Sequence, residues 1–340
     1  MPELTQPGGW LPVIFLGLLG LSMMIYVVLD GFDLGVGILL KRATGAQQDM
    51  MIASIGPFWD ANETWLVLGI GILLVAFPQA HGVILGELYL PVAFMLIGLV
   101  LRGVAFDFRV KAHDDHKAAW NWAFYAGSIL ATFAQGVMIG LYITGFQYTW
   151  LPLLFALFTG LSLLAVYALL GATWLLMKTD TALQLRAVIW ARHSLLLSAL
   201  GIAAVSIVTP LVSTQIFAKW FAYPNIVMLA PVPLITATLF VLMDRVLRWL
   251  PSELQRNSER WCWVPFAATV GIILLAFAGL AYSIFPYLVM DRITIWQAAS
   301  APESLKIILV GVVVVLPAII GYTIFSYKVF WGKARALSYS

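Results

Sequence analysis

The most constraining feature of this sequence is a series of long apolar stretches joined by short polar connections. A helix needs about 20 apolar residues to cross the hydrocarbon core of a membrane, and nine stretches reach that length. They cover approximately residues 11–40, 57–78, 83–103, 119–144, 151–177, 191–213, 224–246, 262–286 and 305–328. No separate soluble domain is evident between them. We therefore expect an all-α, polytopic protein with a single integral membrane domain over residues 1–340.

Composition also favours lipid as the main solvent. Hydrophobic residues make up 62% of the chain and charged residues 10%, whereas soluble domains carry about 25% charged residues. The net charge of +3 is small and dispersed, which argues against nucleic acid as a partner. The single cysteine, Cys262, excludes an internal disulfide framework and a cysteine-based metal cluster within this chain. Because the first basic residue is Lys41, we expect the first apolar stretch to span the membrane and not to be a cleaved signal peptide.

The distribution of basic residues predicts the orientation of the chain. Cytoplasmic loops of membrane proteins carry an excess of lysine and arginine. With nine spans and the N-terminus outside, 16 of the 19 basic residues fall on one side of the membrane. Only Lys219, Arg292 and Lys306 fall on the other side. We therefore expect a periplasmic N-terminus and a cytoplasmic C-terminus.

Ionisable residues are unevenly distributed among the spans. Such side chains are costly inside a membrane unless they are paired or hydrated, so they mark candidate functional sites. The last five spans carry almost none except at their ends, whereas the first three spans are rich in them. The residues concerned are Asp30, Asp33, Asp60, Glu63, Glu87 and Arg102, with Asp107 just beyond. We therefore expect residues 1–145 to carry the functional motifs and residues 146–340 to act mainly as scaffold.

These charges are expected to lie in the cytoplasmic half of the membrane. Asp30 and Asp33 are three residues apart, which places them on one face of the first helix. Asp60 and Glu63 fall in the first two turns of the second span, and Arg102 ends the third. A hydrated acid cluster that opens inward is what a proton-uptake route needs. Structural pairing, for example of Arg102 with Asp60, is an alternative that is compatible with proton conduction.

Three glycines interleave with the first two acids. Gly31 and Gly35 form a small-xxx-small pattern that allows close helix approach, and Gly37 follows two residues later. A phosphate-binding loop would need a Lys-Ser/Thr partner and a preceding strand, and neither is present. We therefore expect these glycines to serve helix packing.

The histidines do not suggest a haem site. His81 falls in a short outer connection, His193 at the start of the sixth span, and His113 and His116 in a charged inner loop. No pair lies at ligand spacing deep within a span. We expect this chain to bind neither haem nor metal on its own, and the His-Asp-Asp-His run to be a solvated loop.

Three motifs in the first 110 residues carry a family resemblance. They are Gly-Phe-Asp-Leu-Gly-Val-Gly at 31–37, Gly-Pro-Phe-Trp-Asp-Ala-Asn-Glu-Thr-Trp-Leu at 56–66, and Leu-Arg-Gly-Val-Ala-Phe-Asp-Phe-Arg at 101–109. In this order and spacing they resemble subunit II of cytochrome bd-type quinol oxidases, and are closest to the cyanide-insensitive branch. The number of spans and the outside N-terminus also fit. We expect two four-helix bundles plus one peripheral helix.

The resemblance implies a heterodimer in the bacterial cytoplasmic (inner) membrane. Subunit I would carry the haems, b and d or b only, together with the quinol site. Electrons from ubiquinol would reduce dioxygen to water, with protons taken from the cytoplasm. This chain would ligate no haem but would support a proton or oxygen path. A structural quinone or lipid and small single-helix accessory subunits are further expected partners.

The resemblance also suggests roles for individual residues. Asp60 matches the acid that is linked to the family's proton route, and Trp65 matches a tryptophan associated with an oxygen path in some members. The remaining proton-path candidates are Asp30, Asp33, Glu63, Arg102 and Asp107.

Two functions from other classes compete with this interpretation. A secondary transporter would use the same acids as coupling sites, but transporters often show paired broken helices in two halves, and here one half holds the polar features. A purely structural assembly subunit predicts that Asp60→Asn and Glu63→Gln leave turnover intact.

Overall fold

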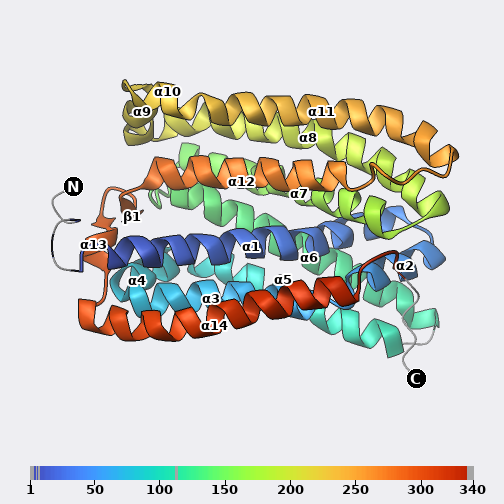
Figure 1. Ribbon diagram of the computed structural model, residues 1–340, viewed down its shortest axis with the longest axis horizontal. Helices are drawn as coiled ribbons and strands as arrows, with labels where there is room; N and C mark the ends of the chain where they lie inside the picture. The colour runs from blue at the N-terminus through green and yellow to red at the C-terminus, as the bar shows by residue number, and fades with distance from the viewer. Residues whose placement is uncertain (1–3, 5, 7, 112–113, 335–340) are drawn as a thin grey trace. The chain divides into compact units, whose positions relative to one another are not determined.

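The computed structural model describes residues 4, 6, 8–111 and 114–334 of the protein (Figure 1). Within these residues the fold is all-α and polytopic, with nine helices that are long and apolar enough to cross a membrane. These candidate spans are Leu11–Arg42, Trp59–Ala76, Tyr89–Arg109, His116–Ile143, Trp150–Lys178, Ala182–Val212, Asn225–Gln255, Val264–Ile284 and Pro302–Val329. The expected fold class and number of spans are therefore confirmed.

The helices that form the spans are joined by short helices and one small hairpin. In chain order the elements are α1 (Leu11–Leu39), the 3-10 helix η2 (Leu40–Arg42), α2 (Gly45–Ile55), α3 (Trp59–Ala76), α4 (Pro78–Glu87), α5 (Tyr89–Lys111), α6 (Asp114–Ile143), α7 (Trp150–Lys178), α8 (Thr181–Val212), α9 (Thr214–Phe221), α10 (Asn225–Leu229), α11 (Pro231–Gln255), α12 (Val264–Ile284), β1 (Tyr287–Val289), β2 (Ile293–Thr294), α13 (Ile295–Ala298) and α14 (Pro302–Val329). The two strands pair antiparallel.

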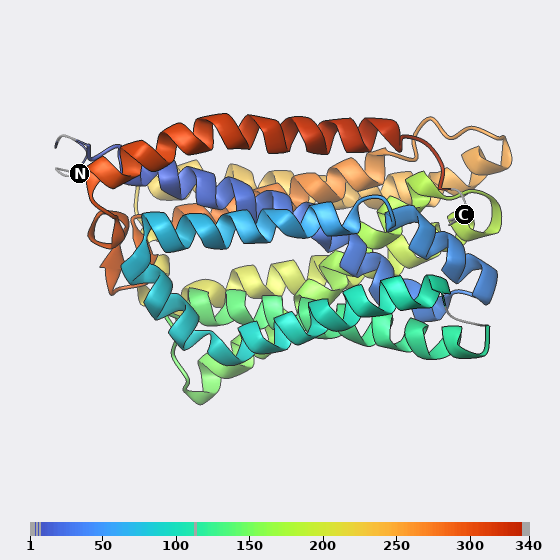
Figure 2. The same ribbon diagram turned by 90° about the horizontal axis from the view of Figure 1, so that it is seen from below.

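Several span boundaries differ from those expected from hydropathy, and the starts of the third and sixth spans show why. The third span begins at Tyr89 and not near residue 83, because Pro78–Glu87 forms the separate helix α4. The chain changes direction between α3 and α4 (Figure 2). The sixth span begins at Thr181 and not near residue 191, because α8 continues through a polar stretch expected to be a connection. There the Gln184 side chain is buried and donates to the Leu176 carbonyl at 3.0 Å.

The chain forms two compact units. Unit 1 contains the described residues up to Asp30, together with Pro57–Glu87 and Ile284–Trp331. Unit 2 contains Gly31–Gly56, Leu88–Ser283 and the described residues from Gly332 onward. The boundary falls inside α1. The division near residue 145 and the grouping into two four-helix bundles plus one helix stay predictions.

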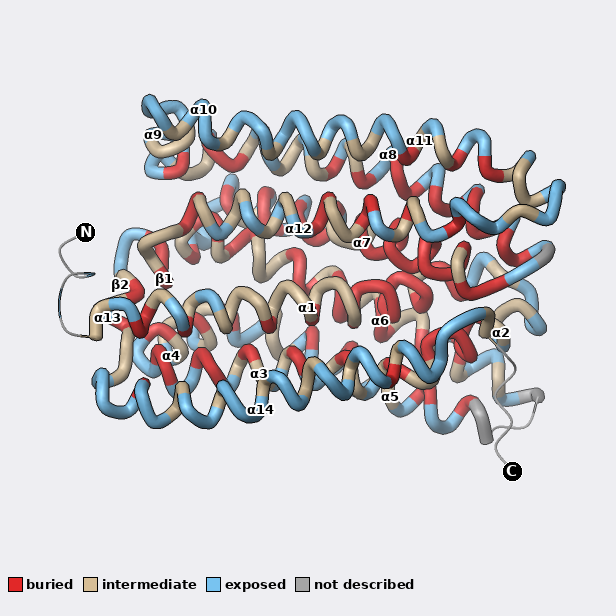
Figure 3. Tube along the Cα trace, in the orientation of Figure 1, coloured by how far each residue is buried: buried red, intermediate tan, exposed pale blue. Residues whose placement is uncertain are grey.

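Unit 2 is built on successive packing of α5, α6, α7 and α8. Glycines allow close contact between its helices, and the second half of α1 packs on α7 in this way. A Cβ atom on Gly35 would lie 1.9 Å from the Tyr167 carbonyl oxygen, which leaves room for glycine alone. Similarly, a Cβ atom on Gly127 would lie 2.6 Å from the Gly98 carbonyl oxygen, where α6 meets α5. Helix α7 is largely buried as a result (Figure 3).

Unit 1 is less enclosed. It consists of the first part of α1, up to Asp30, with α3, α4, the hairpin, α13 and α14. Arg292 in the hairpin forms an ion pair with Glu87 at 3.0 Å, and the Trp296 indole donates to the Gly9 carbonyl at 2.9 Å. Helix α14 is mostly exposed in this chain, as the pale blue trace in Figure 3 shows. An apolar helix with so little burial requires lipid or another protein around it.

Candidate functional site

The polar centre of unit 1 is Asn62, in the first turn and a half of α3. Its side chain is 1% exposed, and its amide donates to the Leu29 carbonyl of α1 at 3.3 Å. Its amide oxygen accepts a hydrogen bond from the Tyr327 hydroxyl of α14 at 3.0 Å. Phe58 stacks on the Tyr327 ring with centroids 4.4 Å apart. One asparagine therefore joins three helices of unit 1, and both its amide nitrogen and its amide oxygen form hydrogen bonds.

Three of the expected proton-path residues lie within two positions of Asn62, or of its partner Leu29, in the sequence. Asp30 directly follows Leu29 and is 1% exposed. Glu63 directly follows Asn62 and is half-buried, whereas Asp60 lies in the first turn of α3 and is exposed. Unit 1 thus holds a buried, a half-buried and an exposed acid close to one α1–α3 contact. A carboxylate in the first turn also suits the positive end of the α3 dipole.

Trp65, the expected oxygen-path residue, follows on the same helix. Its side chain is 2% exposed, and its indole N–H has no hydrogen-bond partner among the described residues. Trp65, Leu68 and Ile72 share one face of α3 because they are three and four residues apart. Leu68 and Ile72 line an open apolar groove of about 330 Å³. The other residues that line it are Leu18, Ser22, Ile308, Gly311, Val312, Val315 and Leu316.

The other three candidates lie in unit 2. Asp33 is 0% exposed and Arg102 is 1% exposed, whereas Asp107 is exposed. Arg102 lies where α5 meets α6, since a Cβ atom on Gly127 would lie 2.9 Å from its backbone nitrogen. Each unit therefore holds part of the expected set. The convergence of all three N-terminal spans on one cytoplasmic site stays a prediction.

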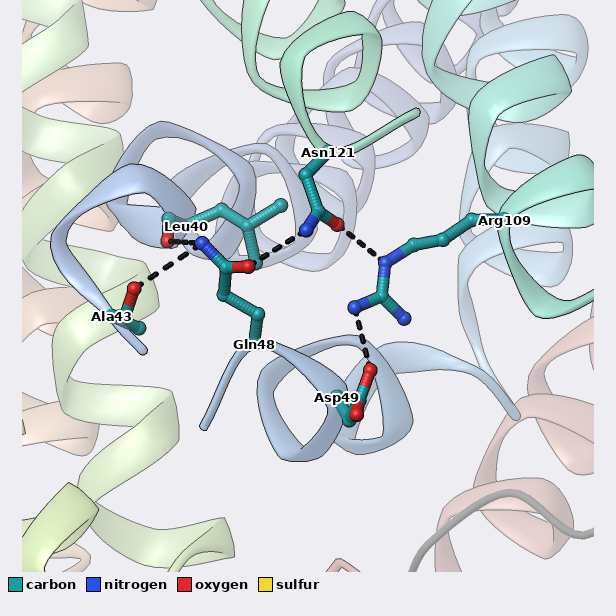
Figure 4. A network of polar contacts seen from close by, with 6 residues as sticks. All are labelled: Leu40, Ala43, Gln48, Asp49, Arg109 and Asn121. Atoms are coloured by element: carbon teal, nitrogen blue, oxygen red, sulfur yellow. Dashed lines mark hydrogen bonds and ion pairs between the residues drawn. The ribbon is translucent and has the colours of Figure 1, made fainter. Parts of the chain in front are cut away.

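Unit 2 also contains a polar network that the sequence analysis missed (Figure 4). At its centre is Arg109, near the end of α5, whose side chain is only 6% exposed. Its Nη2 donates to the Asp49 carboxylate at 2.6 Å, and its Nε donates to the side-chain oxygen of Asn121 on α6. The Asp49 side chain is 53% exposed. The network thus connects water at the surface to a buried arginine.

The same network holds the short helix α2 in place. The Asn121 amide donates to the Gln48 side-chain oxygen at 2.7 Å. The Gln48 amide in turn donates to the Leu40 carbonyl at 3.1 Å and to the Ala43 carbonyl at 3.2 Å. The six residues drawn in Figure 4 therefore form one connected set that ties α2 to α5, α6 and η2.

Helical periodicity contained the signal that would have identified Arg109. Arg102, Ala105, Phe106 and Arg109 are all buried, and their spacing of three, one and three residues marks the inner face of α5. Asp107 falls between these positions and points away from that face, which explains its exposure. The two arginines of the third motif therefore share the buried face of α5, whereas its acid lies on an exposed face.

Comparison with known proteins now supplies the family. The family model described as "Cytochrome bd terminal oxidase subunit II" matches residues 11–330. The chain belongs to this family. Its relatives include cytochrome bd ubiquinol oxidase subunit 2 from Bacillus subtilis (strain 168), 28% identical over 90% of this chain and 91% of the relative. Cytochrome bd-I ubiquinol oxidase subunit 2 from Escherichia coli (strain K12) is 26% identical over 93% of each chain.

A solved structure shares the fold. The bd oxidase from Geobacillus thermodenitrificans contains a chain that matches with a TM-score of 0.75 and 19% identity. The match covers 94% of this chain and 98% of the other. The two chains therefore share one fold over nearly their whole length.

A bd oxidase requires haem, and the first candidate ligands in this chain are its histidines. His116 lies exposed in the first turn of α6, His193 lies exposed in α8, and half-buried His81 lies in α4 and not in a span. His113 lies outside the described residues. Among the residues that are described, no group of three or more His, Cys, Asp or Glu side chains could hold a metal ion. These residues do not fit a haem site, and the haem-free assignment stays a prediction.

Proposed function

We propose that this chain supplies a proton-uptake site to a quinol oxidase whose redox centres lie in another subunit. As a member of its family, the chain is a subunit of a cytochrome bd-type quinol:oxygen oxidoreductase in the bacterial inner membrane. The names of its relatives support ubiquinol as the electron donor. In the complete reaction, quinol gives electrons to dioxygen, and protons from the cytoplasm complete the water that forms.

The proposed partner is a haem-bearing subunit I in a heterodimer. It would hold haems b and d, or b only, because the described histidines of this chain do not fit a haem site. The exposed surface of unit 1, with apolar α14 and acidic Asp60, supports an additional protein on that unit. Small single-helix subunits and a bound quinone or lipid remain proposed partners. Cyanide insensitivity also remains a proposal.

The orientation with a periplasmic N-terminus also belongs to the proposal. It is supported by the excess of basic residues on one side of the spans. In this orientation α3 begins at the cytoplasmic side, so its first turn meets water from which protons can be taken. The Arg109 network would then lie at the same side, because α5 ends there.

The observation that carries the proposed function is the hydrogen bond from Asn62 to Leu29. It fixes the first turns of α3 against α1, beside buried Asp30. Exposed Asp60 can exchange protons with water, and half-buried Glu63 lies almost one turn farther along α3. Asp30 is the most deeply buried of the three acids. This gradation of exposure is what proton transfer from water into an apolar protein requires.

An oxygen path is the second proposed contribution of unit 1. Its support is the apolar groove of about 330 Å³, which shares a face of α3 with Trp65. Dioxygen is uncharged and dissolves in apolar surroundings, so it needs no polar relay. Separate routes for protons and oxygen would explain why one face of α3 carries acids and another carries aromatic and aliphatic side chains.

The proposed function is tested with Asp60→Asn in the complete oxidase. We expect slower oxygen reduction and slower proton uptake, with unchanged haem absorbance, because the substitution removes one titratable group and little volume. Glu303→Gln is the matched control, since Glu303 is also an exposed acid in the first turn of a unit 1 helix. Unchanged turnover in Asp60→Asn would favour a purely structural subunit. Solute transport by the chain alone in liposomes would favour the transporter alternative.

A further inference from the structure

One face of α6 is polar although it is buried. Asn121, Ser128, Thr132 and Gln135 are seven, four and three residues apart, so they lie within about 60° of one another around the helix. Their exposed fractions are 6%, 0%, 0% and 6%. Polar groups buried within a membrane helix are expensive unless hydrogen-bonded or hydrated. The set, called the α6 polar face below, therefore needs an explanation.

The two ends of the α6 polar face have identified partners. At the inner end, Asn121 belongs to the network of Figure 4, which reaches the half-exposed carboxylate of Asp49 through Arg109. At the other end, the Gln135 side-chain oxygen accepts a hydrogen bond of 2.9 Å from the Tyr167 hydroxyl of α7. The polar face thus extends from a hydrated network to a hydroxyl deep in unit 2.

Thr132, between these ends, differs from the buried Ser128 and Thr173 of the same unit. Ser128 donates to the Phe124 carbonyl at 2.8 Å, and Thr173 donates to the carbonyls of Leu169 and Leu170 at 3.0 Å each. Such bonds to the preceding turn satisfy the hydroxyl within its own helix. The Thr132 hydroxyl has no hydrogen-bond partner in the described part of the chain, although its residue is 0% exposed. A buried hydroxyl without a partner loses its hydrogen bonds to water without replacing them, which destabilises the fold.

Helix geometry places Asp33 at the depth of Thr132. Gly37 of α1 faces α6 at Ser128, because a Cβ atom on Gly37 would lie 2.0 Å from the Ser128 hydroxyl. Asp33 is four residues before Gly37, so it lies on the same face of α1. As the first and fourth spans, α1 and α6 run in opposite directions. The turn of α1 before Gly37 therefore lies beside the turn of α6 after Ser128, which contains Thr132.

We propose that Thr132, Gln135 and Tyr167 form a site for bound water beside Asp33, and that the α6 polar face connects it to Asp49. Buried water typically occupies polar sites where it bonds to about three otherwise unsatisfied groups. Hydroxyls and water both donate and accept, so they can pass a proton between them, whereas the Arg109 guanidinium only donates and a proton from Asp49 must pass it on water. The site lies wholly within unit 2 and is separate from the Asp60 site of unit 1. Its role in oxygen reduction depends on the proposed function, whereas water binding does not.

The direct test is a high-resolution structure of the complete oxidase. We expect an ordered water within hydrogen-bonding distance of the Thr132 hydroxyl, and we expect Thr132→Val to lose it. Valine keeps the shape of threonine and removes only the hydroxyl. Thr173→Val is the matched control, because the Thr173 hydroxyl already bonds within its own helix. Thr132→Ser restores a hydroxyl and should retain the water.

The functional test is the rate of proton uptake during a single turnover with dioxygen. We expect Thr132→Val to slow uptake several-fold and to change the solvent deuterium isotope effect, while Thr132→Ser and Thr173→Val resemble the wild type. Haem absorbance verifies that each variant assembles. If Thr132→Val does not assemble, the inference is tested by whether the wild type and Thr132→Ser both hold the ordered water.

Two results would overturn the inference: a dry site in the wild-type structure, or wild-type proton uptake in an assembled Thr132→Val oxidase. If Thr132→Val slowed proton uptake and Asp60→Asn did not, the proposed route through unit 1 would be overturned and the inference about unit 2 would be supported.

Discussion

Units 1 and 2 differ in how far their polar side chains are buried and bonded to neighbours. In unit 2, Asp33 and Arg102 are buried, and Arg109 bonds to neighbours on α2 and α6. Unit 1 buries Asn62 but leaves Asp60 exposed and most of α14 uncovered. The helices α6 and α7 of unit 2 are therefore the part whose structure depends most on its own packing. Helix α14 of unit 1, like α11 of unit 2, is mostly exposed and requires lipid or protein around it.

The largest difference between the units is expected when a glycine of α1 is replaced in each of them. Gly35→Ala should abolish most assembly, because the new Cβ atom would lie 1.9 Å from the Tyr167 carbonyl oxygen. Helix backbones cannot move apart locally without loss of packing in the surrounding core. The measurement is the yield of purified oxidase with normal haem absorbance.

Gly17→Ala is the control for the same helix. Nothing lies within 4 Å of a Cβ atom on Gly17, which belongs to unit 1. Alanine favours helix over glycine by about 1 kcal/mol, so this variant should assemble as well as the wild type. Equal yields of Gly35→Ala and Gly17→Ala would contradict the close approach of α1 to α7.

The next effect concerns the protection of Cys262, which lies between α11 and α12 in unit 2. Burial raises the pKa of its thiol from 9 to about 11, helped by Glu259 and opposed by Lys333. Only the thiolate is nucleophilic. At pH 8 its population should therefore be about 100-fold lower than for a thiol of pKa 9, since each pKa unit is a factor of ten. The expected result is slow alkylation by iodoacetamide that accelerates as the pH rises toward 11.

A cysteine placed on unit 1 provides the comparison. Ala301→Cys, combined with Cys262→Ala, puts a thiol at an exposed position just before α14. It should react at an ordinary rate, and Cys262 should reach a similar rate only after unfolding in detergent. Rapid alkylation of Cys262 in the folded oxidase at pH 8 would show that unit 2 does not shield this connection.

The spans and the family could be predicted from the sequence for clear physical reasons. The apolar length needed to cross a bilayer is a property of composition, and motifs are read from residue order. The ends of spans could not be placed as well. A polar residue such as Gln184 gives the same hydropathy in a loop as in a helix, and its burial in α8 depends on its bond to the Leu176 carbonyl of α7.

The candidate site was only partly predictable because charge alone does not determine burial. Asp107 and Arg109 are two residues apart, yet only Arg109 is buried. Asn62 and Asn121 carry no charge and were not selected, although both connect several elements. Uncharged amides can both donate and accept, so they often link buried groups. Their importance depends on neighbours from distant parts of the chain, which hydropathy does not reveal.

A smaller effect is expected from removing one arginine from each unit. Arg109→Met leaves the Asn121 oxygen and the Asp49 carboxylate without their donor. We expect a loss of about 2 kcal/mol, in line with the cost of orphaning partners of a charged hydrogen bond. Arg292→Met removes an ion pair whose two side chains are 49% and 30% exposed, which is worth about 0–1 kcal/mol. Thermal inactivation of the assembled oxidase should show the larger shift for Arg109→Met; a reversed order would contradict the contrast between the units.

An effect smaller than that of Arg109→Met is expected at Tyr327, where unit 1 does bury a polar contact. Tyr327→Phe removes the hydroxyl that donates to Asn62 but keeps the ring that stacks on Phe58. The Asn62 amide still donates to Leu29, so α3 stays against α1. A single neutral hydrogen bond contributes about 1 kcal/mol, and the loss should appear as a slightly lower inactivation temperature. Tyr322→Phe, at a position of α14 that is 63% exposed, should change nothing. If Tyr327→Phe instead slowed proton uptake as much as Asp60→Asn, then the Tyr327 hydroxyl would belong to the proton route and not only to the packing of α14.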